Sequence, residues 1–185
     1  MTVDFLPAVA TSRSIASEFK AALQTCQSVT GCVAFWTLAP DAFGGALVSA
    51  LSKPGSSVCV DFQKPTDFEK LTAWHHQLSF ARPDPVVHLC VRQSTTLRSE
   101  QDSIGLLHTK IWLFDLGDGQ YDVWVGSHNA TRSAMEGFNL EGTVRVSGHA
   151  SEPEFLPLLE RVGVYLSYIR EQCRPFNPND VVLYQ

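Results

Sequence analysis

The sequence predicts a mixed α/β fold in which one β-sheet is flanked by helices. In the first half of the chain, apolar β-rich runs alternate with segments whose apolar residues recur at helical spacing. In the second half, two strand-like segments flank a glycine-rich turn at 116–120, which predicts a hairpin. The 185 residues, of which 44% are hydrophobic, suffice for one well-buried core, so we expect a single domain over 1–185.

A helix, a strand and a second helix are predicted near the N-terminus. A stripe of four apolar side chains at helical spacing predicts the first helix over 14–25. A continuous apolar, β-rich run predicts a covered strand over 32–38. The Pro-Asp pair at 40–41 is typical of a helix start, so a second helix is expected to run through Leu51, weakened by two glycines.

The alternation continues to residue 91. A second short strand is expected at 57–62. Thr66 and Glu69 then have the spacing of a capping box, which predicts the start of a third helix. The apolar run 86–91 predicts a third buried strand, and the polar stretch 93–102 predicts a surface loop.

The C-terminal half begins with the hairpin. Its two strands are expected over 104–115 and 121–125, joined by the glycine-rich turn. The remaining elements are a short helix at 131–136, a strand at 139–146, a long helix from about 152 to 173 and an edge strand at 181–184.

The composition argues against several functional classes. A net charge of −5 excludes a protein that coats nucleic acid with a broad basic surface, so a polyanion would need a local cationic pocket. No apolar run approaches the ~20 residues of a membrane span, and Asp4 stands where a secretory signal would have basic residues. The five cysteines are odd in number and lack a Cys-x-x-Cys pair, so they indicate reduced thiols and no zinc site. We expect a cytoplasmic protein with no membrane association.

The residue types needed for phosphate chemistry gather in the second half. His108 and Lys110 alternate on the expected strand, so both side chains should share one face, about 7 Å apart along the chain. A neutral imidazole is a competent nucleophile near neutral pH, and an ammonium group stabilises the charge that builds during attack. Ser127 and Asn129 follow the hairpin and offer hydrogen bonds to an oxyanion. Glu141 could orient the imidazole by accepting a hydrogen bond from its Nδ1.

These residues resemble a known family. The segment from His108 to Asp115 matches the His-x-Lys-x4-Asp signature of the phospholipase D superfamily, and 126–129 resembles the Gly-Ser-x-Asn element that follows it. Asn139-Leu140-Glu141 is similar to the Asn-x-Glu segment of many members. The resemblance covers the whole chain and implies an α/β sandwich of the phospholipase D type.

The signature occurs once, which resembles the bacterial single-motif members, largely nucleases and phosphodiesterases that build one active site across a homodimer. The resemblance implies that His108 forms a phosphohistidine and that His108 of the partner subunit protonates the leaving oxygen. It also implies that Lys110 and Asn129 bind the phosphate, that Glu141 positions His108, and that Asp115 is structural or orienting. No metal ion or other cofactor is needed by that mechanism.

The sequence is therefore interpreted as a metal-independent phosphodiesterase, an endonuclease acting on DNA or another nucleic acid. One alternative is a phospholipase D-like enzyme that hydrolyses phospholipid, although no basic amphipathic helix is present to reach a lipid surface. Another is a nucleic-acid-binding or structural subunit that works with a partner protein in a larger defence or restriction complex. The intact set of motif residues argues against that second alternative.

Several other residues have two interpretations. Trp112 and Phe114 either stack on a base or cover the sheet, and His128 has either a structural or a substrate-contacting role. His88 is expected to be a buried, hydrogen-bonded histidine, whereas the adjacent His75 and His76 are expected on a solvated helix face. Four arginines near the motif either follow a phosphate backbone or are ordinary surface charges: Arg92, Arg98, Arg132 and Arg145.

Overall fold

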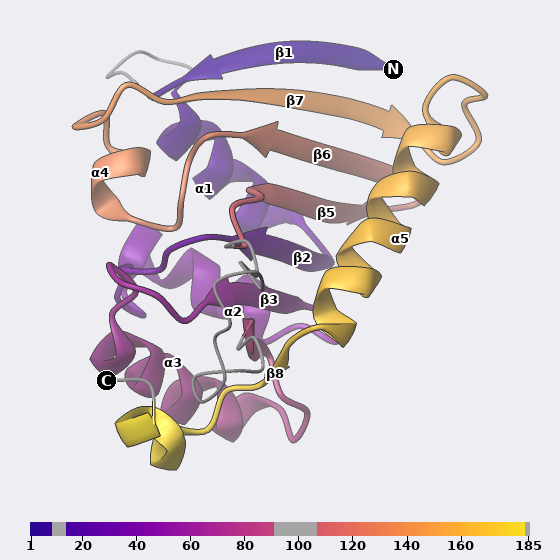
Figure 1. Ribbon diagram of the computed structural model, residues 1–185. Coiled ribbons are helices and arrows are strands. Elements are labelled where there is room, and N and C mark those ends of the chain that lie inside the picture. Colours follow the sequence, from indigo (N-terminus) through magenta and orange to yellow (C-terminus); the bar gives the residue numbers. More distant parts are fainter. Residues whose placement is uncertain (9–13, 91–106, 184–185) are drawn as a thin grey trace, which may run out of the picture.

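The centre of the molecule is a mixed β-sheet. A computed structural model describes residues 1–8, 14–90 and 107–183. The strands are β1 (Thr2–Pro7), β2 (Ser28–Val33), β3 (Ser57–Asp61), β4 (Val87–Cys90), β5 (Ile111–Gly117), β6 (Gln120–Gly126), β7 (Gly142–His149) and β8 (Arg174–Pro175). Within the described residues these eight strands have the order β1-β7-β6-β5-β2-β3-β4-β8 (Figure 1). β2, β3 and β4 run parallel, and the other neighbouring pairs are antiparallel.

Helices cover both faces of this sheet. α1 (Ile15–Thr25), α2 (Ala46–Leu51) and α3 (Phe68–Ala81) pack on one face, and α5 (Leu156–Glu171) crosses the other (Figure 1). Shorter helical segments are η1 (Ala42–Gly45), α4 (Arg132–Met135) and η2 (Pro178–Leu183). In the part of the chain that is described, no helix has both the length and the apolar character required to cross a membrane. The predicted mixed α/β fold with helix-covered faces is confirmed.

The larger core lies between the sheet and α1, α2 and α3. The ring of Phe19 on α1 is at its centre, 5.0 Å from the Trp112 ring, 5.5 Å from Phe114 and 5.7 Å from Trp124. All four side chains are fully buried. Trp112 and Phe114 therefore cover the sheet, and the alternative that they stack on a base is wrong. Gly31 on β2 is required here, because a Cβ at this position would lie 2.3 Å from the Trp112 ring.

A smaller core lies under α5 on the opposite face. Cys32, Cys59 and Cys90 pack there against apolar side chains of the helix, including Leu166 and Ile169. All five cysteines are free thiols, as the sequence predicted. Burial raises the pKa of Cys32 to about 12, so this thiol stays protonated at neutral pH.

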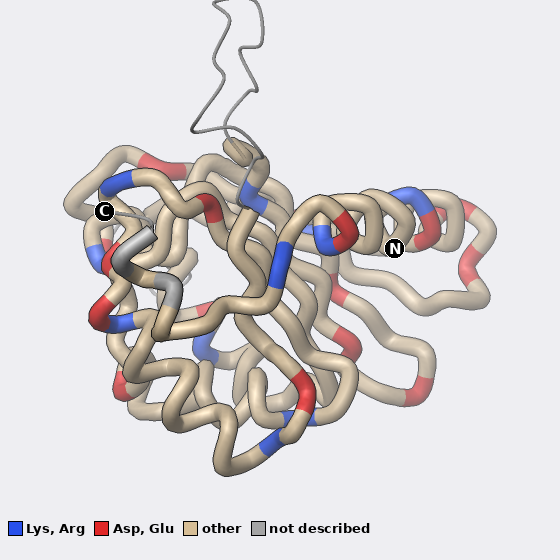
Figure 2. Tube along the Cα trace, turned by 60° about the horizontal axis from the view of Figure 1, so that its bottom comes forward, with Lys and Arg blue, Asp and Glu red and all other residues tan. Residues whose placement is uncertain are grey.

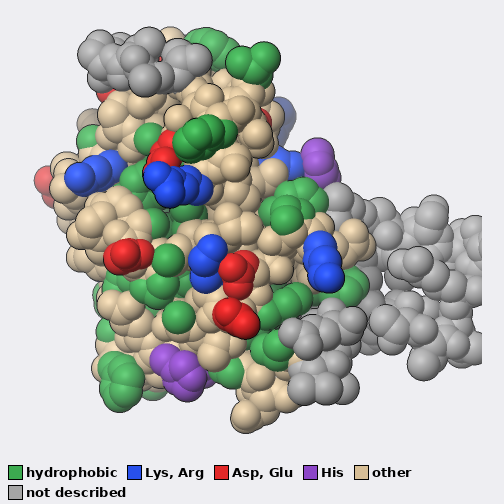
Figure 3. Space-filling model, turned by 90° about the vertical axis from the view of Figure 1, so that its left-hand side faces the viewer, with side chains coloured by type: hydrophobic (Ala, Val, Ile, Leu, Met, Phe, Trp, Pro, Cys, Tyr) green, Lys and Arg blue, Asp and Glu red, His purple; other side chains and the backbone are tan. Residues whose placement is uncertain are grey.

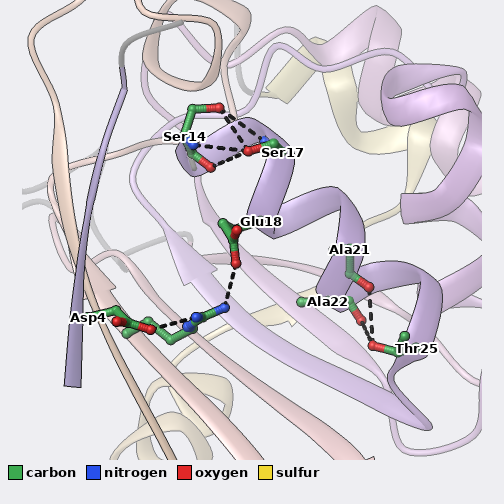
Figure 4. A network of polar contacts seen from close by, with 8 residues as sticks. Asp4, Ser14, Ser17, Glu18, Ala21, Ala22 and Thr25 are labelled. Atoms are coloured by element: carbon green, nitrogen blue, oxygen red, sulfur yellow. Dashed lines mark hydrogen bonds and ion pairs between the residues drawn. The ribbon is translucent and has the colours of Figure 1, made fainter. Parts of the chain in front are cut away.

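The N-terminal strand is fixed by a partly buried ion-pair network (Figure 4). Arg145 on β7 donates from Nη2 to Asp4 on β1 at 2.6 Å and from Nη1 to Glu18 on α1 at 2.8 Å. Its guanidinium also lies 6.0 Å from the Trp124 ring centroid. Because Arg145 is engaged in this way inside the fold, it does not follow a phosphate backbone. The start of α1 is capped by Ser14, whose hydroxyl accepts from the Ser17 N–H at 3.3 Å.

Some predicted elements have different boundaries. The strand expected at 32–38 is β2, at 28–33, and the helix expected after residue 40 is divided into η1 and α2. The division arises because Phe43 and Gly44 adopt left-handed backbone conformations, with φ of 56° and 65°. At α3 the cap is Asp67 rather than Thr66, because the Thr66 hydroxyl donates instead to the Asp61 carbonyl at 2.9 Å.

Two elements differ in kind from the sequence-based expectation. The prediction of an edge strand at 181–184 is wrong, because residues 178–183 form the 3-10 helix η2. The N-terminal strand β1 and the short β8 were not predicted. The predicted surface loop at 93–102 and the start of the strand predicted at 104–115 lie outside the described residues.

Candidate active site

The motif residues other than Asp115 lie at one end of the sheet. β5, β6 and β7 are successive antiparallel neighbours, so the start of β5, the end of β6 and the start of β7 lie side by side (Figure 1). The Gly126 N–H donates to the Lys110 carbonyl at 3.2 Å, and the Ser127 N–H donates to the Gly142 carbonyl at 3.1 Å. The topology thus brings the His108–Lys110 segment, the 126–129 segment and Glu141 to adjoining strand ends.

Lys110 occupies the buried floor of this site. Lys110 is only 4% exposed, and its Nζ donates to the backbone carbonyl of His108 at 2.6 Å. Burial lowers the pKa of Lys110, while the nearby carboxylate of Glu141 raises it and partly offsets the effect. A cation that has lost part of its hydration in this way interacts more strongly with an anion than a solvated one.

His108 is exposed, directly beside the buried lysine. It lies in an extended segment without regular structure, because β5 begins at Ile111 rather than before the motif. The expectation that His108 and Lys110 lie on one strand is therefore wrong. Two side chains hold the segment: Asp61 accepts from the Leu107 N–H at 2.8 Å, and the hydroxyls of Thr109 and Tyr165 are 3.0 Å apart.

Asp61 and Tyr165 were not identified from the sequence as site residues. Asp61 ends β3 and is 1% exposed, which is unusual for a carboxylate. A polar residue at the carboxyl end of a buried parallel strand was the available signal, because such ends face the ligand crevice in α/β sheets. No local pattern marks Tyr165, since only the tertiary fold brings α5 to the motif.

Glu141 and Ser127 are directly joined. The Ser127 hydroxyl donates to Glu141 Oε2, and the Asn139 amide donates to Glu141 Oε1 at 3.4 Å. The Gly142 N–H donates to Ser127 Oγ at 3.2 Å. Within the described residues the structure gives Glu141 no hydrogen bond to His108. Its hydrogen bonds instead join it to Ser127 and Asn139, and its charge acts on Lys110.

Asn129 is oriented by the strand on the other side of the site. Its Oδ1 accepts from the Phe35 N–H at 3.1 Å, just beyond the end of β2. A backbone bridge between Trp36 and Ala130 holds the two segments together, with the Thr37 N–H donating to the Ala130 carbonyl at 2.9 Å. Because Oδ1 is committed as an acceptor, the Nδ2 group of Asn129 is the part that can donate to an anion.

Asp115 is not brought to this cluster. It lies near the far end of β5, about 16 Å from Lys110 by strand rise. Its Oδ1 accepts from the Gly117 N–H at 2.9 Å and so stabilises the hairpin turn. The structure therefore gives Asp115 a structural position.

His128 lies beneath the site and is completely buried. Its Nδ1 is hydrogen-bonded to the Thr143 hydroxyl, and its ring packs edge-on against Phe19 and Trp124. Burial, with the nearby Lys110 charge, lowers the pKa of His128 to about 4. The residue is therefore neutral at physiological pH and structural, and the substrate-contact alternative is wrong.

The sequence matches no protein-family model and no curated protein, but solved structures resemble this chain, including two over nearly the whole length of both chains. NucT from Helicobacter pylori has a TM-score of 0.65 and 16% identity, covering 95% of this chain and 99% of NucT. The phospholipase D family member Nuc from Salmonella typhimurium has a TM-score of 0.61 and 18% identity, covering 95% of this chain and 98% of Nuc. The chain has the phospholipase D fold. The resemblance in architecture predicted from the motif is confirmed.

Other histidine and arginine residues named from the sequence either have partners of their own on this phospholipase D fold or lie outside the described residues. The buried His88 is hydrogen-bonded through Nε2 to the Pro85 carbonyl at 3.2 Å, as expected. Arg132 is exposed and pairs with Glu136 at 2.6 Å, whereas Arg92 and Arg98 lie outside the described residues. Among the residues that the structure describes, no group of three or more His, Cys, Asp or Glu is arranged to hold a metal ion.

The electrostatic surroundings of the site are mixed. Along the chain trace, Lys and Arg alternate with Asp and Glu rather than gathering in one region (Figure 2). The end of the molecule at which β6 finishes and β7 begins likewise presents both charge signs (Figure 3). The part of the chain that the structure describes would therefore attract a phosphate to this site through local donors and not through a broad basic surface. An exposed imidazole such as that of His108 has the chemistry of a nucleophile, and the Lys110 ammonium and the Asn129 amide have the chemistry of donors to an oxyanion.

Proposed function

We propose that this chain is a metal-independent phosphodiesterase, a nuclease that cleaves DNA or RNA through a phosphohistidine on His108. The observation that carries the proposal is the pairing of an exposed His108 imidazole with the buried Lys110 ammonium, which is hydrogen-bonded to the carbonyl of that same histidine. A nucleophile and a desolvated cation two residues apart are the two groups that phosphodiester attack requires.

In the first step, Nε2 of His108 attacks phosphorus and forms a P–N bond. The P–O bond to the leaving group breaks, its electron pair moves to the leaving oxygen, and His108 of the partner subunit supplies the proton. Lys110 and the Asn129 Nδ2 group hold the non-bridging oxygens as negative charge develops. Glu141 favours the protonated form of Lys110, because its carboxylate raises the pKa that burial lowers.

In the second step, water attacks the phosphohistidine. His108 of the partner subunit, now neutral, accepts a proton from that water, and the P–N bond breaks to regenerate the nucleophile. The products are one strand end that carries a phosphomonoester and one strand end that carries a hydroxyl. Both histidines return to their starting protonation states.

A second chain is proposed because the site needs an acid opposite the nucleophile. The neighbouring His128 does not fit this role, since it is buried and its pKa of about 4 leaves it without a proton to donate.

Apolar side chains beside the site support an interface between two copies. Phe5, Val144 and Val125 lie opposite one another on β1, β7 and β6, and all three are exposed. Phe5 also lies against Gly142, next to Glu141.

The proposal is tested by incubating the purified protein with labelled single-stranded DNA, duplex DNA, RNA and phospholipid, each in EDTA. We expect nucleic acid to be cleaved, and cleavage to disappear in His108→Ala. Exclusive hydrolysis of the phospholipid would establish the lipid-cleaving alternative. Binding of nucleic acid without cleavage by the wild-type protein would favour the binding-subunit alternative, and a requirement for a divalent ion would overturn the proposed chemistry.

A further inference from the structure

One flank of α5 carries exposed aromatic side chains next to the catalytic segment. Tyr165 and Tyr168 are 41% and 57% exposed, whereas Val162, Leu166 and Ile169 face the sheet and are buried. Large aromatic rings are normally buried, so two on one exposed helix flank indicate a contact surface.

The position of this flank is fixed relative to the site. The Tyr165 hydroxyl lies 3.0 Å from the Thr109 hydroxyl, and Thr109 stands between His108 and Lys110 in the chain. The helix itself crosses the sheet in front of β5 (Figure 1). A substrate strand that leaves the His108 site on this side therefore meets Tyr165 first and Tyr168 one turn later.

The charges on the helix fit a polyanion on this flank. Four exposed residues with the spacing i, i+4, i+7 and i+11 form what we call the tyrosine stripe: Arg161, Tyr165, Tyr168 and Gln172. The two acidic residues of the helix, Glu160 and Glu171, lie on the adjoining stripe, ~100° further around the axis. Along α5 and its C-terminal cap Gln172, the tyrosine stripe thus combines rings and a guanidinium without a carboxylate.

We propose that the tyrosine stripe binds single-stranded nucleic acid by stacking its unpaired bases on Tyr165 and Tyr168. The proposal rests on the nucleic-acid function proposed above and specifies the strand form that this site takes. In a duplex the base faces are stacked on one another and not accessible to exposed rings, whereas every unpaired base offers a face. Arg161 contacts the backbone phosphates.

The binding test uses protein carrying His108→Ala, so that no substrate is consumed. Fluorescence anisotropy measures its affinity for a labelled oligothymidine, for the same sugar-phosphate chain without bases and for a duplex. Tyr168→Leu removes the ring and keeps an apolar side chain, and Tyr168→Phe keeps the ring. Phe80→Leu is the matched control, because Phe80 is 91% exposed and lies on α3, on the opposite face of the sheet.

We expect Tyr168→Leu to weaken oligothymidine binding about tenfold, with Tyr168→Phe and Phe80→Leu close to wild type. Binding of the chain without bases should not change. Unaltered oligothymidine binding in Tyr168→Leu, an equal loss for the chain without bases, or an equal loss for the duplex would each overturn the proposal.

A second measurement separates this inference from the proposed catalytic function. Bis(4-nitrophenyl) phosphate is a small diester without bases. With His108 intact, the wild-type protein and Tyr168→Leu should therefore hydrolyse it at equal rates. If the wild-type protein fails to hydrolyse this diester or any nucleic acid, the catalytic proposal fails, while the anisotropy result still decides whether the stripe stacks bases.

Discussion

The Lys110 ammonium donates a hydrogen bond to the backbone carbonyl of His108 at 2.6 Å. The two motif residues therefore fix each other: the lysine constrains the backbone that carries the imidazole, and the carbonyl holds the lysine in its buried position. A phosphate bound by the remaining Lys110 donors would lie beside the His108 side chain. Loss of the lysine should consequently affect charge stabilisation and histidine placement together.

Replacement of Lys110 by alanine should lower turnover of a phosphodiester by about 10²–10³, the effect of removing one preorganised donor. Glu141→Gln should have a smaller effect, because it keeps the size of the side chain and one accepting oxygen, while it removes the charge that supports Lys110 and one hydrogen-bond acceptor. Steady-state kinetics on bis(4-nitrophenyl) phosphate provides the comparison. Wild-type turnover in Lys110→Ala would remove this residue from the mechanism.

The alkaline limit of activity should report on Lys110. Since burial lowers the pKa of Lys110 from its ordinary value of 10.5, activity should fall at a lower pH than an exposed lysine would allow. Glu141 raises that pKa, so Glu141→Gln should move the alkaline limb to still lower pH. The pH profile of kcat/KM measures this shift. A limb at the same pH in both proteins would argue against coupling of the two charges.

His128 should make the fold sensitive to acid. Its pKa of about 4 in the folded chain lies below the ordinary 6.5, so the unfolded chain binds a proton first as the pH falls. The free energy of unfolding should therefore drop between these two values, by up to about 3 kcal/mol from this residue.

Urea unfolding of the wild type and His128→Gln, at about pH 7.5 and about pH 4.5, isolates this contribution. His128→Gln should lose less stability between the two conditions, whatever its stability at the higher pH. Equal losses in both proteins would show that His128 is not a source of acid sensitivity.

The protein should be a dimer in solution, with a contact of roughly 1,200–2,000 Å² in total. Phe5→Lys should dissociate it, because the substitution places like charges on both sides of a two-fold contact next to the site. Phe80→Lys is the control, since Phe80 is equally apolar and more exposed but distant on α3. Light scattering measures the mass, and a fully active wild-type monomer is incompatible with a shared site.

Much of the architecture was predictable because local signals agreed with the tertiary fold. Ser14 caps α1 where the helical stripe begins, and the glycine-rich turn forms the expected hairpin. β1 was missed because its pattern is inverted: Val3 and Phe5 face outward, and Asp4 is held inside by Arg145. A strand whose charged residue faces the core carries no ordinary strand signal.

The motif named the candidate site residues, but their arrangement could not be predicted from the sequence. The motif spacing named Lys110, yet its burial depends on the strand ends that surround it. Asp61 and Tyr165 hold the His108 segment from β3 and α5, which are distant in the sequence. Glu141 bonds to Ser127 because the register of β6 and β7 sets Ser127 beside Gly142, and periodicity does not define that register.

The central claim is that His108 attacks phosphorus and is transiently linked to it. The direct measurement is to stop a reaction with labelled oligonucleotide in alkali, where a P–N bond to histidine survives, and to determine the mass of the peptide that contains residue 108. We predict a nucleotidyl phosphate adduct on His108 that is lost in acid and absent from His108→Ala. Continued hydrolysis with no adduct on this peptide, or with the adduct on another residue, would contradict the account.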